Sequence, residues 1–523
     1  MAQIILIQPL SGQLDEMSIR LPEGLLAIAA LPVQKGYDIR IIDQRLTKDF
    51  ERAVRDEVGP ETVIFGVTCI TGEQIGYAVE VTQLLKANWP NIPVVWGGVH
   101  ATLLPEQTCE HPDIDYVVAG DGDLVFCELF ERLRDGLPVD DLRGLVYKTS
   151  AGAVSSNAGE VELNFKSNGN YQVVRRNGST DVIRDLDSLP PTPYELVDFS
   201  KYEIFHTDDG SKSATLNTAR GCPFRCRFCS DPVLNDGKWR GLTPDKIIER
   251  LVVLFDRYNV RWVFFQDDYF PGSKKRFLEI LERLTKYNGS LKWSTCGIRA
   301  DIICKMTPEE MNLLERSGCH SLEMGIESGS ERIITLLNKA ETLEEMREAN
   351  RLLAKTGIKV KYSFIIGFPT ETDEEMESTI DFALDLERVN PNAYCFVFNF
   401  LPIVGTPFFH DAVQQGFKAP TTLEGWAEMD FQKWMRHYSG WHKPEKIRKL
   451  EAIAFTSYFH NTNVLFKLGG SKLIRFCYRC YYPVAKWRFE NKKFGFFVEW
   501  HIKDAILALR PLIRTLAKAV NRI

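Results

Sequence analysis

The chain has 523 residues, which is too long for a single hydrophobic core and fits about three domains of the usual size. Its composition, 44% hydrophobic and 26% charged, excludes extended disorder and predicts a soluble body. The formal net charge of -6 and the lack of a reader motif argue against a nucleic-acid-binding protein. The first residues, MAQIILIQPL, lack the basic leader and cleavage site of an export signal, so we expect a cytoplasmic protein.

The N-terminal part alternates short β-branched runs with helix-length amphipathic segments. We predict strands at residues 4–7, 39–42, 63–67, 94–96 and 116–119, and helices such as 22–35 and 73–87. This pattern predicts a doubly wound α/β domain with about five parallel strands over residues 1–140. Ligands of such sheets bind at the carboxyl ends of the strands, in this chain at residues 9–12, 68–72, 97–102 and 120–123.

A polar stretch rich in Gly, Ser and Asn follows, and residues 141–205 are predicted to be a linker with a small hairpin. A second strand and helix series occupies residues 206–420. Its strands are predicted at 214–217, 262–266, 292–296, 321–325, 359–366 and 394–400, with helices such as 244–258 and 274–287. Six such units predict a partial barrel, whose chemistry belongs at the carboxyl ends of the strands.

Three of the twelve cysteines crowd into one octapeptide, directly after the first predicted barrel strand. The segment ARGCPFRCRFCS places Cys222, Cys226 and Cys229 at the spacing C-x3-C-x2-C. Structural zinc and iron-sulfur clusters normally take four protein ligands, and no fourth cysteine lies nearby. The spacing favours a cluster with one open position for a substrate, while zinc or a coincidental reduced cysteine loop remains an alternative. Basic residues at 220, 225 and 227 are expected to favour thiolates.

This segment closely resembles the signature of the radical S-adenosylmethionine superfamily. In that family three cysteines bind a 4Fe-4S cluster, and the amino acid end of S-adenosylmethionine chelates the fourth iron. Further matching stretches end the later barrel strands: residues 266–268 (QDD), 297–301 (GIRAD), 324–331 (MGIESGSE), 364–372 (FIIGFPTET) and 402–407 (PIVGTP). Their order and strand-end placement are similar to those of the superfamily.

The resemblance implies roles for residues that bind adenosylmethionine. Glu327 and Ser328 would contact the cofactor and Arg299 its carboxylate. Asp267 and Asp268 would lie by its amino group, and Gln266 before them is also expected to bind the cofactor. Gly367 and Pro369 would shape the adenine pocket. Each residue also has a structural alternative, because the carboxylates could cap helices and the Gly-Pro segment could be an ordinary turn.

The α/β domain before the barrel resembles the cobalamin-binding subclass of the superfamily, the class B radical methyltransferases. The matching stretches are residues 21–30, 36–43, 96–102 and 115–123, and with the barrel they cover about four fifths of the chain. The resemblance implies that the strand-end loops bind cobalamin. The residues concerned are Ser11, Gly12, Thr68, Thr71, Gly97, Gly98, His100, Gly120 and Gly122. The alternative is a domain of the same shape that has lost the cofactor.

The first loop lacks the D-x-H-x-x-G motif that supplies a lower histidine ligand in cobalamin-dependent mutases. We therefore expect base-off cobalamin without a histidine below the cobalt. His100 follows the fourth strand, but such a histidine more often hydrogen-bonds locally, and we do not assign it to the cobalt.

Residues 421–523 are predicted to be a helical extension rich in aromatic and basic side chains. Residues 467–523 alone carry thirteen Lys and Arg against three acidic residues, a net charge of +10. The amphipathic helix predicted over residues 502–523 could lie on the inner face of an anionic membrane, or it could pack on the barrel with a solvated basic face. Cys477 and Cys480 have no partner cysteines, so a second metal site is not expected.

The leading functional prediction is radical C-methylation of an unactivated carbon in a small-molecule or lipid-like substrate. A 5'-deoxyadenosyl radical would remove the hydrogen, methylcobalamin would supply the methyl group, and a flavodoxin or ferredoxin would supply electrons. The alternatives are a radical cyclase or ring-rearranging enzyme of tetrapyrrole or isoprenoid type, and a sulfur-inserting enzyme acting on tRNA or protein. A non-enzymatic binding module would leave the strand-end motifs without a role.

Overall fold

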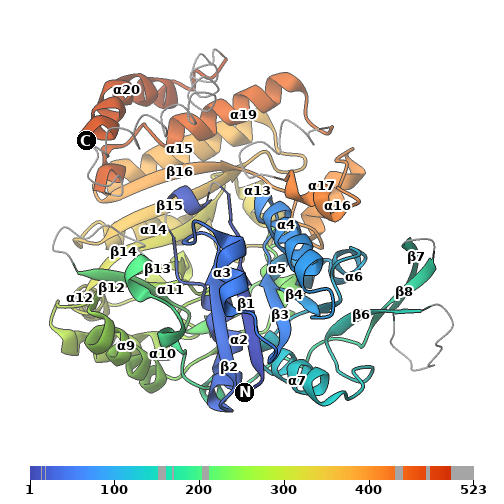
Figure 1. The fold of residues 1–523 in the computed structure, drawn as a ribbon. Coiled ribbons are helices and arrows are strands. Elements are labelled where there is room, and N and C mark those ends of the chain that lie inside the picture. Colours follow the sequence, from blue (N-terminus) through green and yellow to red (C-terminus); the bar gives the residue numbers. More distant parts are fainter. Residues whose placement is uncertain are drawn as a thin grey trace, which may run out of the picture.

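The computed structural model describes residues 1–12, 14–17, 19–150, 161–167, 170–202, 211–429, 440–466 and 472–495. These residues form two large sheets with their helices, lying side by side (Figure 1). The helix predicted over residues 502–523 lies outside the described residues.

Five parallel strands form the main part of the N-terminal sheet, as predicted. Their order across the sheet is β2-β1-β3-β4-β5. They are β1 (Gln3–Gln8), β2 (Asp38–Asp43), β3 (Thr62–Thr68), β4 (Val94–Gly97) and β5 (Tyr116–Val118). The helices between them are α1 (Leu14–Met17), α2 (Glu23–Gln34), α3 (Phe50–Glu57), α4 (Glu73–Asn88), α5 (Val99–Leu103), α6 (Pro105–Cys109) and α7 (Gly122–Asp135).

Helices cover both faces of this sheet, which explains its continuously apolar strands. In β1, Ile4 and Leu6 pack in one cluster with Phe126 of α7, whereas Ile5 and Ile7 pack in the cluster that contains residues of α4. Since successive side chains of a strand point to opposite faces, a strand covered on both sides needs apolar residues at every position. The doubly wound prediction is confirmed.

The segment predicted as a linker contributes three more strands. β6 (Leu145–Ser150) pairs antiparallel with β5, and β8 (Asn170–Arg176) and β7 (Val161–Ser167) continue the sheet as a hairpin (Figure 1). The hairpin was expected, but the strand that joins it to the sheet was not. β6 is an interior strand, paired with β5 on one side and β8 on the other, but only its first three residues, Leu145 to Tyr147, are apolar, so its sequence signal is weak.

The second sheet is the predicted six-stranded partial barrel. Its parallel strands follow one another in chain order, from β9 at one edge to β16 at the other. They are β9 (Lys212–Leu216), β12 (Val260–Phe265), β13 (Lys292–Ile298), β14 (Cys319–Glu327), β15 (Lys359–Ile366) and β16 (Ala393–Asn399). A separate two-residue ladder joins β10 (Ala219–Arg220) to β11 (Arg240–Gly241).

Most of the barrel helices begin at a capping threonine or serine. Thr307, Thr342 and Thr372 each form a capping box with the Glu three residues later, which satisfies two exposed N–H groups at the helix start. The helices of this part are α8 (Asp231–Asn235), α9 (Pro244–Tyr258), α10 (Lys274–Leu284), α11 (Ala300–Ile303), α12 (Pro308–Arg316), α13 (Glu331–Leu336), α14 (Leu343–Leu353), α15 (Asp373–Val389), α16 (Pro407–Gln414) and α17 (Leu423–Ala427).

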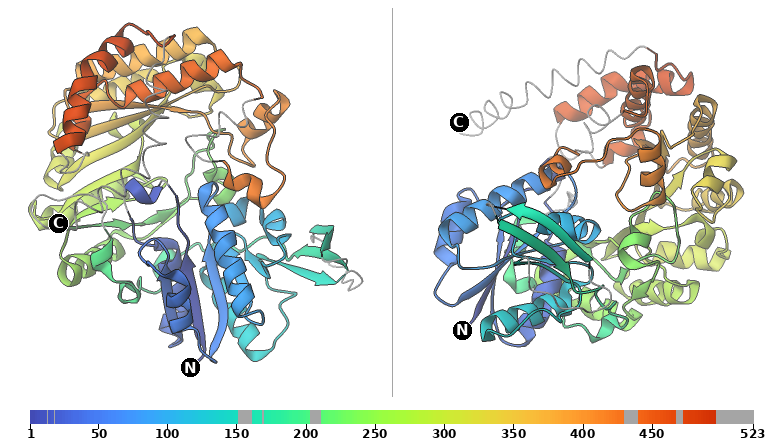
Figure 2. Two further views of the ribbon diagram at one scale, coloured as in Figure 1. Left: turned by 45° about the horizontal axis from the view of Figure 1, so that its top comes forward. Right: turned by 90° about the vertical axis from the view of Figure 1, so that its right-hand side faces the viewer.

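The C-terminal helices α19 (Pro444–Ser457) and α20 (Lys472–Glu490) cover the free edge of the barrel at β16 (Figure 2). Ser457 Oγ accepts a hydrogen bond from the Val397 N–H at 3.0 Å, which satisfies part of the open strand edge. Tyr394 and Phe396 of β16 pack with Tyr478 of α20. Among the described residues, no helix is both long and apolar enough to cross a membrane.

Replacing Ser457 by Ala tests this edge contact. Ser457 is 1% exposed, so the Val397 N–H would lose its partner in a place that water does not reach. We expect a loss of about 1–3 kcal/mol in the free energy of unfolding, measured by urea denaturation. Ser378→Ala, which removes an exposed hydroxyl bonded to Glu374 O, is the matched control and should change stability by less than about 0.5 kcal/mol. Equal stability of both variants would contradict the proposed edge contact.

Candidate functional site

The carboxyl ends of the two sheets meet at one cavity of about 520 Å³. From the N-terminal sheet it is lined by residues that follow β3, β4 and β5, and from the barrel by residues that follow β9 and β12. The predicted site residues among its lining are Thr68, Gly97, Gly98, Gly120, Gly122, Gln266 and Asp268. Two sets of residues predicted for different cofactors thus face the same space.

The three cysteines lie in the loop between β10 and α8, and all three thiols are free and half-buried. The Cys222 N–H donates to Asp231 Oδ2 at 2.7 Å, and the Asp231 N–H lies 3.4 Å from Cys229 Sγ. Burial raises the pKa of Cys222 to about 11 and that of Cys229 to about 12, and it also raises the pKa of Cys226. Free thiols in one short loop suit a soft metal centre, and each must lose a proton to bind it.

The three arginines of the cysteine motif have other partners, and none of them is among the main influences on the pKa values of the three cysteines. Arg220 pairs with Asp123, and Arg227 lies 2.9 Å from Asp411. Arg225 donates to a backbone carbonyl at 3.2 Å. The sequence could not show these partners. The cations that do lower the pKa of Cys226, against the larger effect of burial, are Lys339 and Arg299.

Asp267 holds the start of the cysteine loop. Its carboxylate accepts hydrogen bonds from the N–H and hydroxyl of Thr218 and, at 2.9 Å, from the Ala219 N–H. Burial raises the pKa of Asp267 to about 6. Asp267 does not line the cavity, whereas Gln266 and Asp268, its neighbours in the sequence, do. The structure therefore gives Asp267 a supporting position beneath the loop, in place of the predicted cofactor contact.

Four buried charged side chains gather beside Cys226. Lys339 Nζ lies 3.1 Å from Glu341 Oε2 and 3.6 Å from Glu327 Oε1, and Arg299 Nη2 lies 3.5 Å from Glu341 Oε2. Burial raises the pKa of Glu327. Burial opposes the charge of Lys339, but the two glutamates outweigh it and raise its pKa. Arg299 and Glu327 were predicted. Lys339 and Glu341 were missed, because they follow the fourth motif in a turn without a recognisable pattern.

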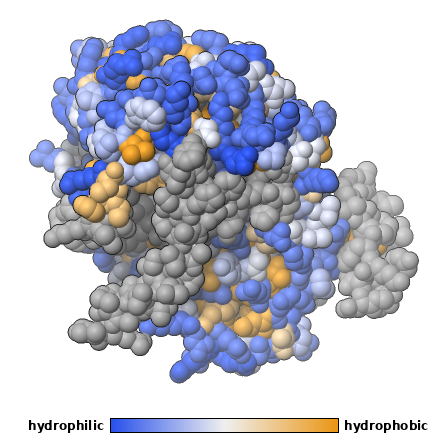
Figure 3. Space-filling model, turned by 90° about the horizontal axis from the view of Figure 1, so that it is seen from above, coloured by the Kyte–Doolittle hydropathy of each residue, from blue (hydrophilic) through white to orange (hydrophobic). Residues whose placement is uncertain are grey.

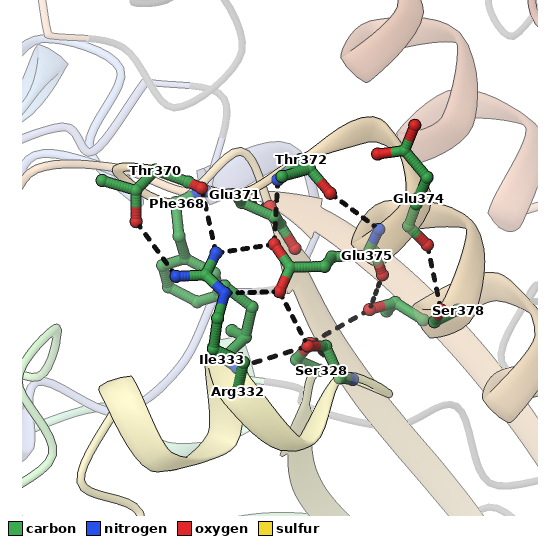
Figure 4. A network of polar contacts seen from close by, with 12 residues as sticks. Ser328, Arg332, Ile333, Phe368, Thr370, Glu371, Thr372, Glu374, Glu375 and Ser378 are labelled. Atoms are coloured by element: carbon green, nitrogen blue, oxygen red, sulfur yellow. Dashed lines mark hydrogen bonds and ion pairs between the residues drawn. The ribbon is translucent and has the colours of Figure 1, made fainter.

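Figure 4 shows the polar contacts that join the end of β14 to the start of α15. Arg332 Nη2 lies 2.6 Å from Glu375 Oε2 and donates to Thr370 O at 3.0 Å. Hydrogen bonding to Arg332 lowers the pKa of Glu375 to about 2. The hydroxyl of the fully buried Ser328 lies 3.1 Å from that of Thr379. Ser328, predicted to contact adenosylmethionine, thus helps to fix this strand-end loop.

The predicted adenine-pocket loop is held by a buried carboxylate. Glu371 accepts hydrogen bonds from the N–H groups of Gly367 and Phe368, the latter at 3.1 Å, and burial raises the pKa of Glu371 to about 7. Gly367 has a φ of +84°, a conformation that favours glycine. Pro369 follows in the same turn. The turn is therefore a specific structure held by Glu371, which the sequence did not single out.

Of the front-domain residues predicted to bind cobalamin, some line the cavity and others do not. Ser11, Gly12, Thr71 and His100 do not line the cavity, although all four lie at the predicted strand ends. His100 is buried, its Nδ1 lies 3.1 Å from Thr71 Oγ1, and burial lowers its pKa to about 4. The other ring nitrogen, His100 Nε2, is buried and has no hydrogen-bond partner among the described residues.

The cavity continues as an apolar space beneath the glycine loops. Its walls include Val67, Val95, Trp96, Val118 and Phe126, and Gly97 and Gly98 leave the rim without side chains. Gly98 has a φ of +96°, and a Cβ there would lie 2.7 Å from Cys69 O. An apolar hollow under a bare backbone rim suits a large flat ligand such as cobalamin. None of the described residues that line it is a histidine.

Comparison with known proteins gives matches to both halves of the chain. The radical SAM superfamily matches residues 216–383, and the B12 binding domain matches residues 21–130. The protein of Pyrococcus horikoshii named uncharacterized methyltransferase PH0819 is 31% identical over 452 residues, 85% of this chain and 89% of that protein. The cytidylyl-2-hydroxyethylphosphonate methyltransferase of Streptomyces wedmorensis is 25% identical over 82% of this chain and 84% of its own.

Solved structures share the fold. The cobalamin-dependent S-adenosylmethionine radical enzyme OxsB, with aqua-cobalamin and S-adenosylmethionine bound, has a TM-score of 0.67 at 17% identity and covers 100% of this chain and 80% of its own. The radical S-adenosylmethionine methyltransferase TsrM of Kitasatospora setae has a TM-score of 0.62 at 17% identity, over 80% of this chain and 76% of its own. With its two domain matches and its methyltransferase relative, the chain belongs to the family of cobalamin-binding radical S-adenosylmethionine enzymes.

Proposed function

We propose that this protein methylates an unactivated carbon of a small molecule, using a 4Fe-4S cluster, S-adenosylmethionine and cobalamin. One observation carries the proposal: Gly221 and Ser230, which flank the three cysteines in the chain, and the glycine-lined rim of the front domain border one cavity. None of the three cysteines lines this cavity itself. A methyl group that passes between two cofactors needs both within reach of one substrate, and a shared cavity supports such an arrangement. The methyltransferase names of two relatives support the same reaction class.

The cluster side of the site has residues suited to each part of its ligand. Cys222, Cys226 and Cys229 would hold three irons of the cluster, and the fourth would be open to the amino acid end of adenosylmethionine. That end carries one ammonium and one carboxylate. Next to Cys226, Glu327 is suited to the ammonium and Lys339 to the carboxylate. When bound, the cluster supplies the electron that cleaves adenosylmethionine, and cobalamin carries the methyl group.

On the front-domain side, we infer that cobalamin binds base-off, with its nucleotide tail in the apolar hollow and no histidine below the cobalt. The rim at Gly97 and Gly98 supports this, because both glycines line the cavity and leave it without side chains at this point. A flavodoxin or ferredoxin is the electron donor that we propose for the cluster.

Removal of the cluster ligands tests the radical step. In the variant with Cys222, Cys226 and Cys229 all replaced by Ala, we expect no reconstituted iron and sulfide, and no 5'-deoxyadenosine from adenosylmethionine with dithionite or reduced flavodoxin. Cys477→Ala with Cys480→Ala removes two exposed cysteines and is the matched control, which should keep full activity. Cluster and cleavage in the triple variant would contradict the assignment. Deoxyadenosine without S-adenosylhomocysteine would favour cyclisation or rearrangement over methylation.

Filling the rim of the hollow tests cobalamin binding. A Cβ at Gly97 would meet only Val118 O, at 3.8 Å, so Gly97→Leu should fold normally while its side chain occupies the cavity. We expect the dissociation constant for hydroxocobalamin, measured by equilibrium dialysis, to rise at least tenfold at an unchanged thermal midpoint. Gly59→Leu is the control, because a Cβ at Gly59 meets nothing within 4 Å and Gly59 lies outside the cavity lining. Equal affinities of the two variants would refute this cobalamin site.

We also propose contact with an anionic membrane through the basic C-terminal region. On α20, Phe476 and Trp487 are 65% and 56% exposed, and Arg475 and Arg479 lie on the same helix. Most of the described surface seen from above is hydrophilic (Figure 3). Exposed aromatic side chains among basic ones are suited to the interface of an anionic membrane, where the rings enter the lipid and the basic groups meet the head groups. Sedimentation with phosphatidylglycerol vesicles should recover most of the protein, and Trp487→Ser with Phe476→Ser should reduce it several-fold. No binding by the unchanged protein would exclude this contact.

A further inference from the structure

The base of the cysteine loop is closed by two arginines that face each other. β10 and β11 are antiparallel, and in their register Arg220 lies directly opposite Arg240. The loop between them, residues 221–239, contains all three cysteines. Like charges directly opposite in an antiparallel pair destabilise it, so this two-residue ladder needs charge compensation from elsewhere.

The compensation comes from the other domain. Asp123 binds Arg220 with two parallel hydrogen bonds, Nη1 to Oδ2 at 2.7 Å and Nη2 to Oδ1 at 2.8 Å. Asp121 lies between the two arginines, 3.2 Å from Arg220 Nη1 through Oδ1 and in contact with Arg240 Nη1 through Oδ2. The exposed fractions of the Asp123 and Arg240 side chains are 6% and 5%. Paired charges buried to this extent interact strongly, and losing one partner is costly.

The two aspartates belong to the loop that borders the proposed cobalamin cavity. They lie at the start of α7, Asp121 as the residue before the helix and Asp123 in its first turn. All four residues of the sequence Gly120-Asp121-Gly122-Asp123 line the cavity. Gly120 has a φ of +96°, so the backbone there follows a path that other residues rarely adopt. A ligand that orders this loop also fixes the carboxylates that hold the ladder.

We propose that Asp121 and Asp123, through Arg220 and Arg240, couple the cobalamin pocket to the cysteine loop, so that bound cobalamin stabilises the cluster. This inference rests on the proposed function, since it takes cobalamin as the ligand of the cavity. The four side chains are positioning residues: they act on the cysteines through the ladder and do not themselves carry the reaction. Coupling between two binding sites is reciprocal, so the cluster must strengthen cobalamin binding by the same factor.

The test compares cluster loss with and without cobalamin. The anaerobically reconstituted full-length protein is mixed with an iron chelator, and the loss of cluster absorbance is followed with and without saturating hydroxocobalamin. Coupling between sites is typically about 5- to 150-fold, and we expect cobalamin to slow cluster loss about tenfold. Asp123→Asn keeps the shape of the side chain but removes its charge. In this variant the ratio of the rates of cluster loss without and with cobalamin should fall to nearly one. Arg220→Lys keeps the charge without the two parallel bonds and should give an intermediate factor.

Glu106→Gln is the matched control. It breaks the partly buried ion pair between Glu106 of α6 and Arg176 of β8 (3.1 Å) in the front domain. Cobalamin should slow cluster loss in this variant as much as in the unchanged protein. Asp121→Asn is the second variant, to be used if Asp123→Asn fails to fold. In this variant too, cobalamin should no longer slow cluster loss. The dissociation constant of cobalamin should also be lower for cluster-loaded than for cluster-free protein, because coupling between binding free energies is reciprocal.

The outcomes separate this inference from the proposed function. If the unchanged protein binds cobalamin but loses its cluster at the same rate with and without it, the coupling is refuted and the function stands. The coupling would likewise be refuted if cobalamin slowed cluster loss in both aspartate variants as much as in the unchanged protein. If the unchanged protein does not take up cobalamin at all, the proposed methylation is refuted together with the coupling.

Discussion

Strand direction is the constraint on which both cofactor sites depend. The five main strands of the first sheet are parallel, and so are the six of the second, which means that each sheet ends its strands at a single edge. Ligands of such sheets bind at that edge. Here the two edges face one cavity, so residues between Glu23 and Asp268 that lie far apart in the sequence meet around a common ligand space. The covering helices, the caps and the C-terminal extension all serve to hold these edges in place.

The second determinant is the pairing of buried charge. An isolated charge inside a protein costs several kcal/mol, and such groups persist only with partners. Around Cys226 the partners are Lys339, Glu327, Glu341 and Arg299. At the domain interface they are the aspartates after β5 and the arginines of the two-residue ladder. Both clusters lie next to the cysteine loop, so the surroundings of a cluster bound there are fixed by residues outside the signature motif.

Most of the fold follows from the sequence, because its signals are local. All eleven predicted parallel strands occur within a few residues of their predicted positions, since a strand covered on both faces is a continuous apolar run. β6 was missed, because its apolar run is only three residues long and is followed by Lys, Thr and Ser. Among the site residues, the glycines at 97, 98, 120 and 122 were found because a bare backbone rim shows directly in the composition of a loop.

The sequence by itself determined the two-domain α/β organisation, the cysteine loop and the strand ends that carry the site. Only the tertiary structure decided what individual polar side chains do. Asp267 is directed under the loop while Asp268 faces the cavity. Arg220 pairs with Asp123, and Lys339 and Arg299 are the cations that lower the pKa of Cys226. The physical reason is that strand formation depends on nearest neighbours in the chain, whereas the partner of a buried charge is chosen by which distant segment packs against it.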